Sequence, residues 1–454
     1  MKDTYFDTII LGAGPAGCAA ALKLATGAQS VLLVETNKIG GVCLNEGCIP
    51  AKIFLKHSNL YHAIKESQRS GIIESSCSYS HEAAIKRKNE KIAALRNNLE
   101  TELSSAGVTT VYGFGEIIGK TGRGEIEVAV AGQHYMGGNL IVATGSRNAP
   151  TPTFLSGYAK PVITSSDIFD VADVPKELLI IGAGAVGLEI ADYFSSIGTR
   201  VTVLEKTAKL GLKIDKDISE MYQKSLQRKG IKLLLETEVT ESGSDYIICR
   251  KNEEQIRLEP DLVFLSIGRR QSADNIGLDR LGIKIGENGI ITDDFCQTAD
   301  AAVFACGDVN GKSLYAHTAM REGETVASSI MGKRTELDYS RIPAIVYGST
   351  EYAQLGKTEE ELRQTSIPCK AFGKSLLYNG RYFAENEKDY SYCKLIIQSD
   401  SGCLLGVQML GVAVAEILLA LQVMLDNEMS VHQINEIIFA HPTVGEIIKD
   451  ICSL

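Results

Sequence analysis

The chain has 454 residues, a net charge of −10, 43 glycines and no tryptophan. A chain of this length should fold as several domains, each with its own core. The acidic balance argues against nucleic-acid binding and against association with an anionic membrane surface. No apolar run is long enough to span a bilayer, and the first residues resemble neither a signal peptide nor an organelle presequence, so we expect a cytoplasmic protein.

A glycine-rich turn lies near the start of the chain. An apolar strand beginning at Phe6 leads into Gly12, Gly14 and Gly17, followed by a predicted helix and a second strand that ends at Glu35. The first glycine permits a tight turn, the second lets a pyrophosphate approach the backbone, and the third lets the helix pack on the strand. The helix N-terminus attracts the pyrophosphate, and the acidic residue binds the ribose hydroxyls. This segment therefore predicts a dinucleotide-binding unit.

Cys43 and Cys48 follow this unit closely, in the segment from Gly40 to Lys52. In a cytoplasmic protein, such a pair indicates redox or metal chemistry rather than a structural disulfide. No second Cys or His pair stands at zinc spacing, so redox chemistry is favoured and we expect no metal. The segment between the cysteines is predicted to begin a helix, whose N-terminus would favour a thiolate.

Residues 81–107 are predicted to form a long amphipathic helix whose apolar face includes Leu95 and Leu103. The basic run at residues 86–88 is interpreted as part of its solvated face. Residues 139–146 form a predicted apolar strand that ends in small residues, and prolines at 150 and 152 mark a linker.

Residues 178–205 repeat the first unit: an apolar strand, the glycines Gly182, Gly184 and Gly187, a helix, and a strand followed by Glu205. Two matched copies are far more specific than one. The first copy lies beside the cysteine pair and is assigned a flavin, and the second is assigned the nicotinamide cofactor. A carboxylate at Glu205 suits the free 2′-hydroxyl of NAD and repels the 2′-phosphate of NADP, so we expect NAD.

Towards the C-terminus, residues 301–308 form another predicted strand, which ends in Gly307 and Asp308. After Arg341 the pattern changes to strands and then long helices, which we interpret as a separate domain. His441 lies near the end of the chain, and Glu446 follows it near the start of the last predicted helix. A carboxylate at this spacing can fix the tautomer of the imidazole and stabilise its charged form.

Over nearly its whole length the chain resembles the pyridine nucleotide–disulfide oxidoreductase family. The motifs that carry the resemblance are both glycine-rich turns and residues 40–52, 143–145, 268–270, 305–308, 316–317 and 440–446. The family implies an α/β fold with two Rossmann-like dinucleotide-binding domains and a C-terminal α+β dimerisation domain. The implied segments are an FAD-binding domain in two parts (1–148 and 271–340), an NAD-binding domain (149–270) and an interface domain (341–454).

The resemblance also implies residue roles. Cys43 meets a dithiol substrate and Cys48 lies beside the flavin. Lys52 lies near the flavin and pairs with Glu189. His441 is the general base, supported by Glu446, and reaches the cysteine pair of the other subunit in a homodimer. The implied FAD-binding residues are Gly12, Gly14, Gly17, Glu35, Gly41, Lys52, Gly115, Ala143, Thr144, Gly145, Asp308 and Ala316. The implied NAD-binding residues are Gly182, Gly184, Val186, Gly187, Glu205, Val239 and Gly268.

The implied activity is oxidation of a dihydrolipoyl group on a partner protein, with FAD and a Cys43–Cys48 disulfide as carriers and NAD as acceptor. The partner would be the acyltransferase of a 2-oxo acid dehydrogenase or the carrier protein of a glycine cleavage system. Glu46, between the cysteines, departs from the family pattern and leaves the substrate preference open. Ala51 and the absence of proline before Glu351 are further departures.

Three alternatives remain. A glutathione-type reductase would use NADP and prefer arginines where this chain has Glu205. A mercuric reductase would need a cysteine pair at the C-terminus, where this chain has only Cys452. A non-catalytic scaffold that binds FAD would belong to a different class, although such a chain would have no need to retain Cys43, Cys48 and His441.

Overall fold

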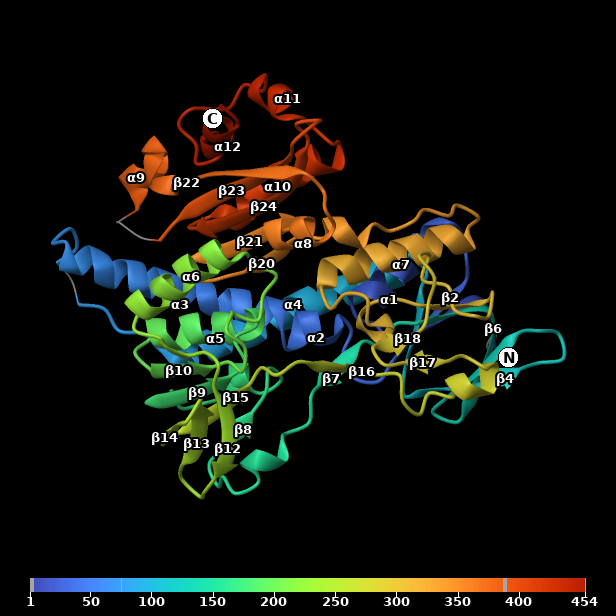
Figure 1. Cartoon of the computed structure of the whole chain (residues 1–454). Helices are drawn as coiled ribbons and strands as arrows, with labels where there is room; N and C mark the ends of the chain where they lie inside the picture. Colours follow the sequence, from blue (N-terminus) through green and yellow to red (C-terminus); the bar gives the residue numbers. More distant parts are fainter. Residues whose placement is uncertain (1–3, 75, 387–389, 454) are drawn as a thin grey trace. The chain divides into compact units, whose positions relative to one another are not determined.

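The computed structural model describes residues 4–74, 76–386 and 390–453 (Figure 1). These described residues fall into two compact units. The first comprises Met1–Pro50, Ile85–Ala149 and Gly268–Tyr339, and the second comprises Ala51–Ala84, Pro150–Ile267 and Ser340–Leu454. The division into four segments expected from the sequence remains a prediction. Within the described ranges, no helix is long and apolar enough to cross a membrane.

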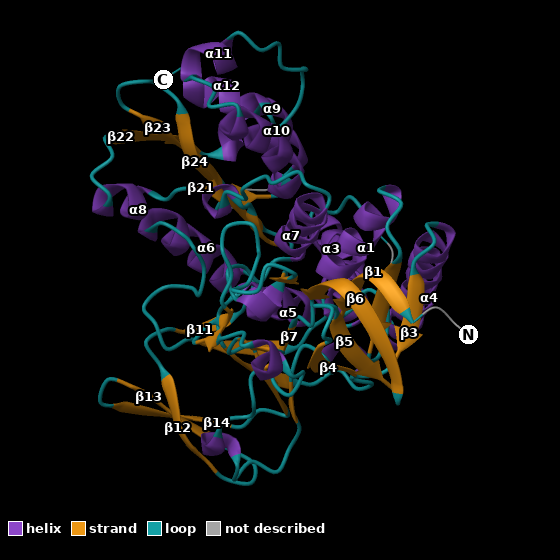
Figure 2. Ribbon diagram, turned by 90° about the vertical axis from the view of Figure 1, so that its right-hand side faces the viewer, coloured by secondary structure: helices purple, strands orange, loops and turns teal. Residues whose placement is uncertain are grey.

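The first unit is built on a sheet with the strand order β3-β2-β1-β6-β5-β4, and β19 pairs with β6. Figure 2 shows β1, β3, β4, β5 and β6 of this sheet. Its strands are β1 (Tyr5–Leu11), β2 (Val31–Glu35), β3 (Thr109–Tyr112), β4 (Gly115–Lys120), β5 (Ile126–Val130), β6 (Gln133–Val142) and β19 (Val303–Ala305). The pairs among β1, β2, β3, β6 and β19 are parallel, whereas β5 pairs antiparallel with both β4 and β6. Helix α1 (Pro15–Thr26) follows β1 and packs against α7 (Ala316–Ile330). A short ribbon of β7 (Ser146–Asn148) and β16 (Arg269–Gln271) also belongs to this unit.

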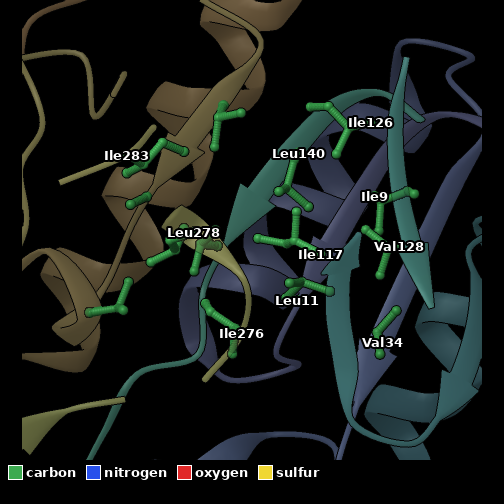
Figure 3. Close-up of a cluster of buried hydrophobic side chains, with 14 of the residues drawn as sticks. Ile9, Leu11, Val34, Ile117, Ile126, Val128, Leu140, Ile276, Leu278 and Ile283 are labelled. Carbon is green, nitrogen blue, oxygen red and sulfur yellow. The ribbon is translucent and has the colours of Figure 1, made fainter. Parts of the chain in front are cut away.

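The central strands of this sheet bury both faces. Ile9 and Leu11 of β1 join one apolar cluster, whereas Ile10 between them joins another. This alternation is expected because successive side chains of a strand point to opposite faces. Figure 3 shows the first cluster, in which β1, β2 and β6 meet β4, β5 and the segment from Ile276 to Ile283. The second cluster contains residues of α1, α7 and α4 (His81–Ser105).

The predicted helix at 81–107 is confirmed as α4, but its polar face differs from the expectation. Lys88 is only 3% exposed, and Leu95 is 41% exposed. Lys88 stands four residues after Ala84 and four before Ile92, so it lies on the same helical face as these buried residues. The basic run at 86–88 is therefore not uniformly solvated.

The second unit contains a parallel sheet of order β11-β10-β9-β15-β8. Its strands are β8 (Val162–Ile163), β9 (Glu177–Ile181), β10 (Arg200–Leu204), β11 (Lys232–Leu234) and β15 (Leu262–Leu265). Helix α5 (Ala185–Ser196) follows β9, and α6 (Lys216–Arg228) follows β10. A smaller antiparallel sheet of β12 (Glu238–Ser242), β13 (Ile247–Lys251) and β14 (Glu254–Leu258) precedes β15.

The C-terminal part of this unit is an antiparallel sheet of order β20-β21-β24-β23-β22. Its strands are β20 (Ala344–Val346), β21 (Glu351–Gly356), β22 (Cys369–Lys374), β23 (Tyr392–Gln398) and β24 (Leu404–Gly411). The helices after the strands are α10 (Val414–Asp426), α11 (Val431–Asn435) and α12 (Glu446–Cys452), and they share one apolar core with the sheet. The sequence predicted strands and then long helices; the helices that follow the strands are short, and two further helices, α8 (Glu359–Gln364) and α9 (Gly380–Glu385), lie between strands.

A matched pair of glycine variants tests the packing of the first turn. A Cβ on Gly17 would lie 1.9 Å from the carbonyl oxygen of Gly12, whereas a Cβ on Gly14 would meet no described atom within 4 Å. We expect Gly17→Ala to lower the free energy of unfolding by at least about 2 kcal/mol, because helix and turn must move apart. Urea unfolding followed by circular dichroism measures this. Gly14→Ala is the control, and equal unfolding of the two variants would contradict the packing argument.

Candidate active site

The two glycine-rich turns have the same backbone geometry. Gly12 and Gly182 have φ values of 103° and 107°, a region that favours glycine. A Cβ would lie 2.3 Å from the carbonyl oxygen of Ala143 at Gly12, and 2.2 Å from that of Ser266 at Gly182. Gly12 and Gly182 are therefore each required for two reasons: the backbone angle favours glycine, and the close approach to a neighbouring strand end leaves no room for a Cβ.

The acidic residues of the two copies also make corresponding hydrogen bonds. The Oε2 atom of Glu35 accepts from the backbone N–H of Ala13 at 2.8 Å, and Oε1 accepts from that of Asn37 at 2.8 Å. In the second copy, Glu205 accepts from the N–H groups of Ala183 and Thr207, each at 2.9 Å. Each carboxylate is thus held beside its own glycine-rich turn by these hydrogen bonds.

The first turn has the groups that a dinucleotide requires. Gly14 is the N-cap of α1 and has no side chain, so the N–H groups of the first helical turn stay open to an anion. Gly41 packs against Gly14, because a Cβ on Gly41 would lie 2.8 Å from the Gly14 Cα atom. The segment that carries the cysteines therefore lies against the first glycine-rich turn. Together with the Glu35 carboxylate, these groups fit the pyrophosphate and ribose of a dinucleotide such as FAD.

A polar network surrounds Asp308, the last residue of the predicted 301–308 strand. The Ser146 hydroxyl donates to Asp308, and the Arg269 guanidinium donates to the Ser146 hydroxyl and to its carbonyl oxygen, each at 2.7 Å. Burial lowers the pKa of Arg269, while Asp308 and Glu46 favour its charged form. The sequence analysis included Ser146 and Arg269 in its predicted strand and motif but assigned neither of them a role. The signal was weak, because they come together only through pairing of β7 with β16.

Cys43 lies on the short helix α2 (Gly41–Asn45), and Cys48 is the first residue of α3 (Cys48–Arg69). A Cβ on Gly47 would lie 3.6 Å from the Cys43 Cα atom, so the chain folds back over Cys43 just before Cys48. Asn45 supports this bend by donating to the carbonyl oxygens of Ile39 and Gly41. Cys43 is half-buried and Cys48 is exposed. The position of Cys48 at a helix N-terminus favours a thiolate.

Lys52 and Glu189 lie together, as the resemblance implied. The ammonium nitrogen of Lys52 lies 2.9 and 2.8 Å from the two carboxylate oxygens of Glu189. It also lies 3.8 Å from the centre of the Tyr347 ring, a cation–π contact. The backbone N–H of Tyr347 donates to Glu189 at 3.2 Å. Tyr347 was missed by sequence reasoning, because its sequence neighbours carry no motif that points to Lys52.

His441 and Glu446 also lie together. The Nδ1 atom of His441 is 3.0 Å from one Glu446 oxygen, and the backbone N–H of Thr443 donates to the other at 2.8 Å. The Thr443 N–H and, next, His441 lower the pKa of Glu446, so the carboxylate stays ionised. The His441 side chain is 81% exposed in the single chain. Glu446 is the first residue of α12, which positions it against the ring.

The remaining predicted residues are spread along the elements that frame the two turns. Thr144 donates its hydroxyl hydrogen to the Ser272 carbonyl oxygen at 2.7 Å. Gly115 is buried against Leu11, where an added Cβ would lie 2.6 Å from a methyl carbon. The others are Gly145, after β6, Ala316, at the start of α7, Val186 on α5, Val239 on β12, and Gly268, just before β16. Among the described residues, no group of three or more His, Cys, Asp or Glu side chains is arranged to hold a metal ion.

Comparison with known proteins identifies the family. Residues 6–323 match the family described as pyridine nucleotide-disulphide oxidoreductase, and residues 342–452 match its dimerisation domain. The chain belongs to the pyridine nucleotide-disulphide oxidoreductases. The resemblance inferred from the sequence, and its α/β fold class, are therefore confirmed, as is the flavin disulfide oxidoreductase character that the family carries.

Curated relatives of this oxidoreductase cover nearly all of it. Dihydrolipoyl dehydrogenase from Geobacillus stearothermophilus is 31% identical over 447 residues, covering 97% of this chain and 94% of the relative. The dihydrolipoyl dehydrogenase of Chlamydia trachomatis is 30% identical over 449 residues, covering 97% and 95%.

Solved structures share the fold of this oxidoreductase. LpdA from Mycobacterium tuberculosis superposes with a TM-score of 0.88 at 23% identity, covering 99% of each chain. The HOCl-induced flavoprotein disulfide reductase RclA from Escherichia coli gives a TM-score of 0.86 at 23% identity, also over 99% of each chain.

Proposed function

We propose that this oxidoreductase oxidises a protein-bound dihydrolipoyl group to its cyclic disulfide and reduces NAD to NADH. The observation that carries the proposal is the packing of the cysteine segment, through Gly41, against the first of two equivalent dinucleotide turns. Electron transfer from thiols to a nicotinamide requires a dithiol carrier beside one dinucleotide and a second site for the nicotinamide dinucleotide. The cysteine pair and the two turns would supply these parts. The dihydrolipoyl dehydrogenase relatives favour this substrate over other disulfides.

FAD is assigned to the first turn and NAD to the second. Gly12, Gly14 and Gly17 would receive the FAD pyrophosphate, Glu35 its adenosine ribose, and Asp308 its ribityl chain. When bound, FAD supplies the two-electron chemistry that connects thiols to the nicotinamide. Glu205 would bind the adenosine ribose of NAD, and its charge would repel the 2′-phosphate of NADP.

The chain's own residues carry out the thiol chemistry. His441 takes the proton of one substrate thiol, and the resulting thiolate attacks the Cys43 sulfur of a Cys43–Cys48 disulfide. The sulfur–sulfur bond breaks, and Cys48 leaves as a thiolate. The second substrate thiol releases its proton to solvent and attacks the substrate sulfur bonded to Cys43, which closes the cyclic disulfide and releases Cys43 as a thiolate. The two cysteine thiolates then hold the electron pair, which bound FAD would accept for transfer to NAD as the disulfide re-forms.

We infer that the protein works as a cytoplasmic homodimer. The match to the dimerisation domain covers residues 342–452, which include His441. The exposure of His441 supports its use at the neighbouring subunit's cysteines. The substrate would be a lipoyl-bearing acyltransferase or glycine-cleavage carrier protein.

The direct test is NADH formation by the purified yellow protein with dihydrolipoamide and NAD, run beside NADP. Rapid NADH formation with little NADPH is the expected result. Absence of turnover in protein that retains FAD would redirect the assignment to another disulfide substrate or to a scaffold role.

Replacing Glu205 with alanine tests the cofactor assignment. We expect weaker NAD binding by about 1–3 kcal/mol, because hydrogen bonds to a ribose hydroxyl pair are lost. Steady-state kinetics as a function of NAD concentration gives the change in KM, and flavin absorbance gives the FAD content. The FAD content should be unchanged. An unaltered KM for NAD would contradict the assignment of Glu205.

A further inference from the structure

Helix α5 carries a second carboxylate–lysine pair, one turn beyond Glu189. The Lys229 ammonium lies 2.6 Å from the Asp192 carboxylate, and these side chains are only 9% and 5% exposed. Ser349 donates to Asp192 from its backbone N–H at 3.1 Å and from its hydroxyl at 2.8 Å. Lys229 also contacts the Ser349 hydroxyl at 2.7 Å. Asp192, Lys229 and Ser349 therefore form a closed triangle, in which the two charged side chains are buried and Ser349 is half-buried.

This triangle holds one end of a short connection between β20 and β21, residues 347–349, which we call the strap. Glu189 holds the other end, through the backbone N–H of Tyr347. In the middle, the Asn59 side chain donates to the Gly348 carbonyl oxygen at 3.0 Å. A Cβ on Gly348 would lie 3.0 Å from the Asp192 carboxyl carbon, so the strap lies directly on this carboxylate.

The strap links the second ion pair to the first. Tyr347 places its ring 3.8 Å from the Lys52 ammonium while its N–H holds Glu189. Lys52 is therefore fixed by Glu189 and Tyr347, and the strap that presents Tyr347 is held by Asp192. A buried carboxylate needs a compensating charge, and Lys229 supplies it at the C-terminal end of α6.

We propose that Asp192 and Lys229 are positioning residues for the Lys52–Glu189 pair, which they serve by holding the strap and by balancing the charge on α5. The proposal rests on the function proposed above and on the position of Lys52 near the flavin that the family resemblance implies. Asp192 and Lys229 touch neither substrate nor cofactor in this assignment. Their effect is transmitted through Tyr347 and through the local field.

Other ionisable groups also face this pair. On α3 these are His62, Glu66 and Arg69. Burial and the nearby Lys229 lower the pKa of His62, whereas Glu66 and Asp192 raise it. From the remaining elements, Glu189 and Glu351 lie in the same electrostatic neighbourhood around Tyr222. The test therefore compares variants that change the charge of the pair in opposite directions while these other ionisable groups stay the same.

The experiment uses full-length holoenzyme carrying Lys229→Met, Asp192→Asn, or both. Each protein is reduced with dithiothreitol, and the long-wavelength absorbance of a thiolate beside oxidised flavin is followed as the pH is lowered. Lys229→Met removes a positive charge, which disfavours a thiolate. The pH at which half of this absorbance is lost, the midpoint, should therefore rise by about half a pH unit. Asp192→Asn should lower it by a similar amount. The double variant should return near the wild-type midpoint.

The sign of the midpoint shift separates the proposal from a purely structural role, because a structural role alone would not shift the midpoints of the two single variants in opposite directions. Shifts in the same direction, or unchanged midpoints, would overturn the proposal, and either single variant is decisive through its sign. Loss of FAD from all three variants would show a structural role and also overturn it. Wild-type protein that lacks this absorbance would overturn the proposed function together with the inference. Ser349→Ala, which removes the Ser349 hydroxyl but keeps its backbone N–H bond to Asp192 and the charge of the triangle, should shift the midpoint by less than either charge variant.

Discussion

The Cys48→Ser variant is expected to retain FAD but to lose dithiol-driven reduction of the flavin. Its turnover with dihydrolipoamide and NAD should fall by about 1,000-fold or more, because a serine oxygen cannot form the disulfide through which the electron pair passes. Retention of FAD is expected because Cys48 is exposed and serine is nearly isosteric with cysteine. Absorbance of the purified variant and stopped-flow mixing with dihydrolipoamide measure the two effects.

Cys43→Ser should lose turnover as well, since the proposed mechanism has the substrate attack the Cys43 sulfur. Cys403→Ser is a suitable control, because Cys403 is also only partly buried and lies in the turn between β23 and β24, away from both glycine-rich turns in sequence. Wild-type turnover by Cys48→Ser would refute the redox role of the pair.

The His441→Gln variant is expected to slow dihydrolipoamide oxidation by about 100- to 10,000-fold, the range typical of a lost general base. Glutamine keeps polarity at this position but cannot take the thiol proton. The measurement is kcat for dihydrolipoamide as a function of pH. The loss should shrink at high pH, where the substrate thiol ionises unaided.

Oxidation of NADH by ferricyanide gives an internal control for His441→Gln, because that reaction needs no thiol proton transfer and should stay at the wild-type rate. Glu446→Gln should show a smaller loss of dihydrolipoamide oxidation, since Glu446 is proposed to act through the imidazole, by orienting it and stabilising its charged form. A variant that slows both reactions equally would indicate damage to the fold rather than loss of a base.

Much of the fold follows from local signals. The glycine-rich turns mark two strand–turn–helix units, because Gly12 and Gly182 have backbone angles that favour glycine and Gly17 and Gly187 leave no room for a Cβ. The apolar stripe of α4 is also visible in the sequence. The burial of Lys88 is not visible in the sequence. A run of basic residues predicts a solvated face, whereas burial depends on which face of the helix packs against the rest of the unit.

Some residues of the candidate site could be predicted from sequence motifs, and others could not. Lys52, Glu189, His441 and Glu446 lie within recognisable motifs, and the structure brings each of the two pairs into contact. Tyr347, Asp192 and Lys229 carry no motif. They meet through tertiary packing of residues 37 to 158 positions apart in the sequence, which no local pattern encodes.

The hydrogen bonds of Glu35 and Glu205 have a kinetic consequence. Each carboxylate is anchored to two backbone N–H groups of its own unit, so little side-chain entropy remains to be lost when a ribose binds. Both proposed dinucleotide sites would thereby be preorganised, and association should resemble docking onto a rigid surface rather than induced fit. Reconstitution of the apoprotein with its flavin should then be single-exponential, with a rate proportional to flavin concentration.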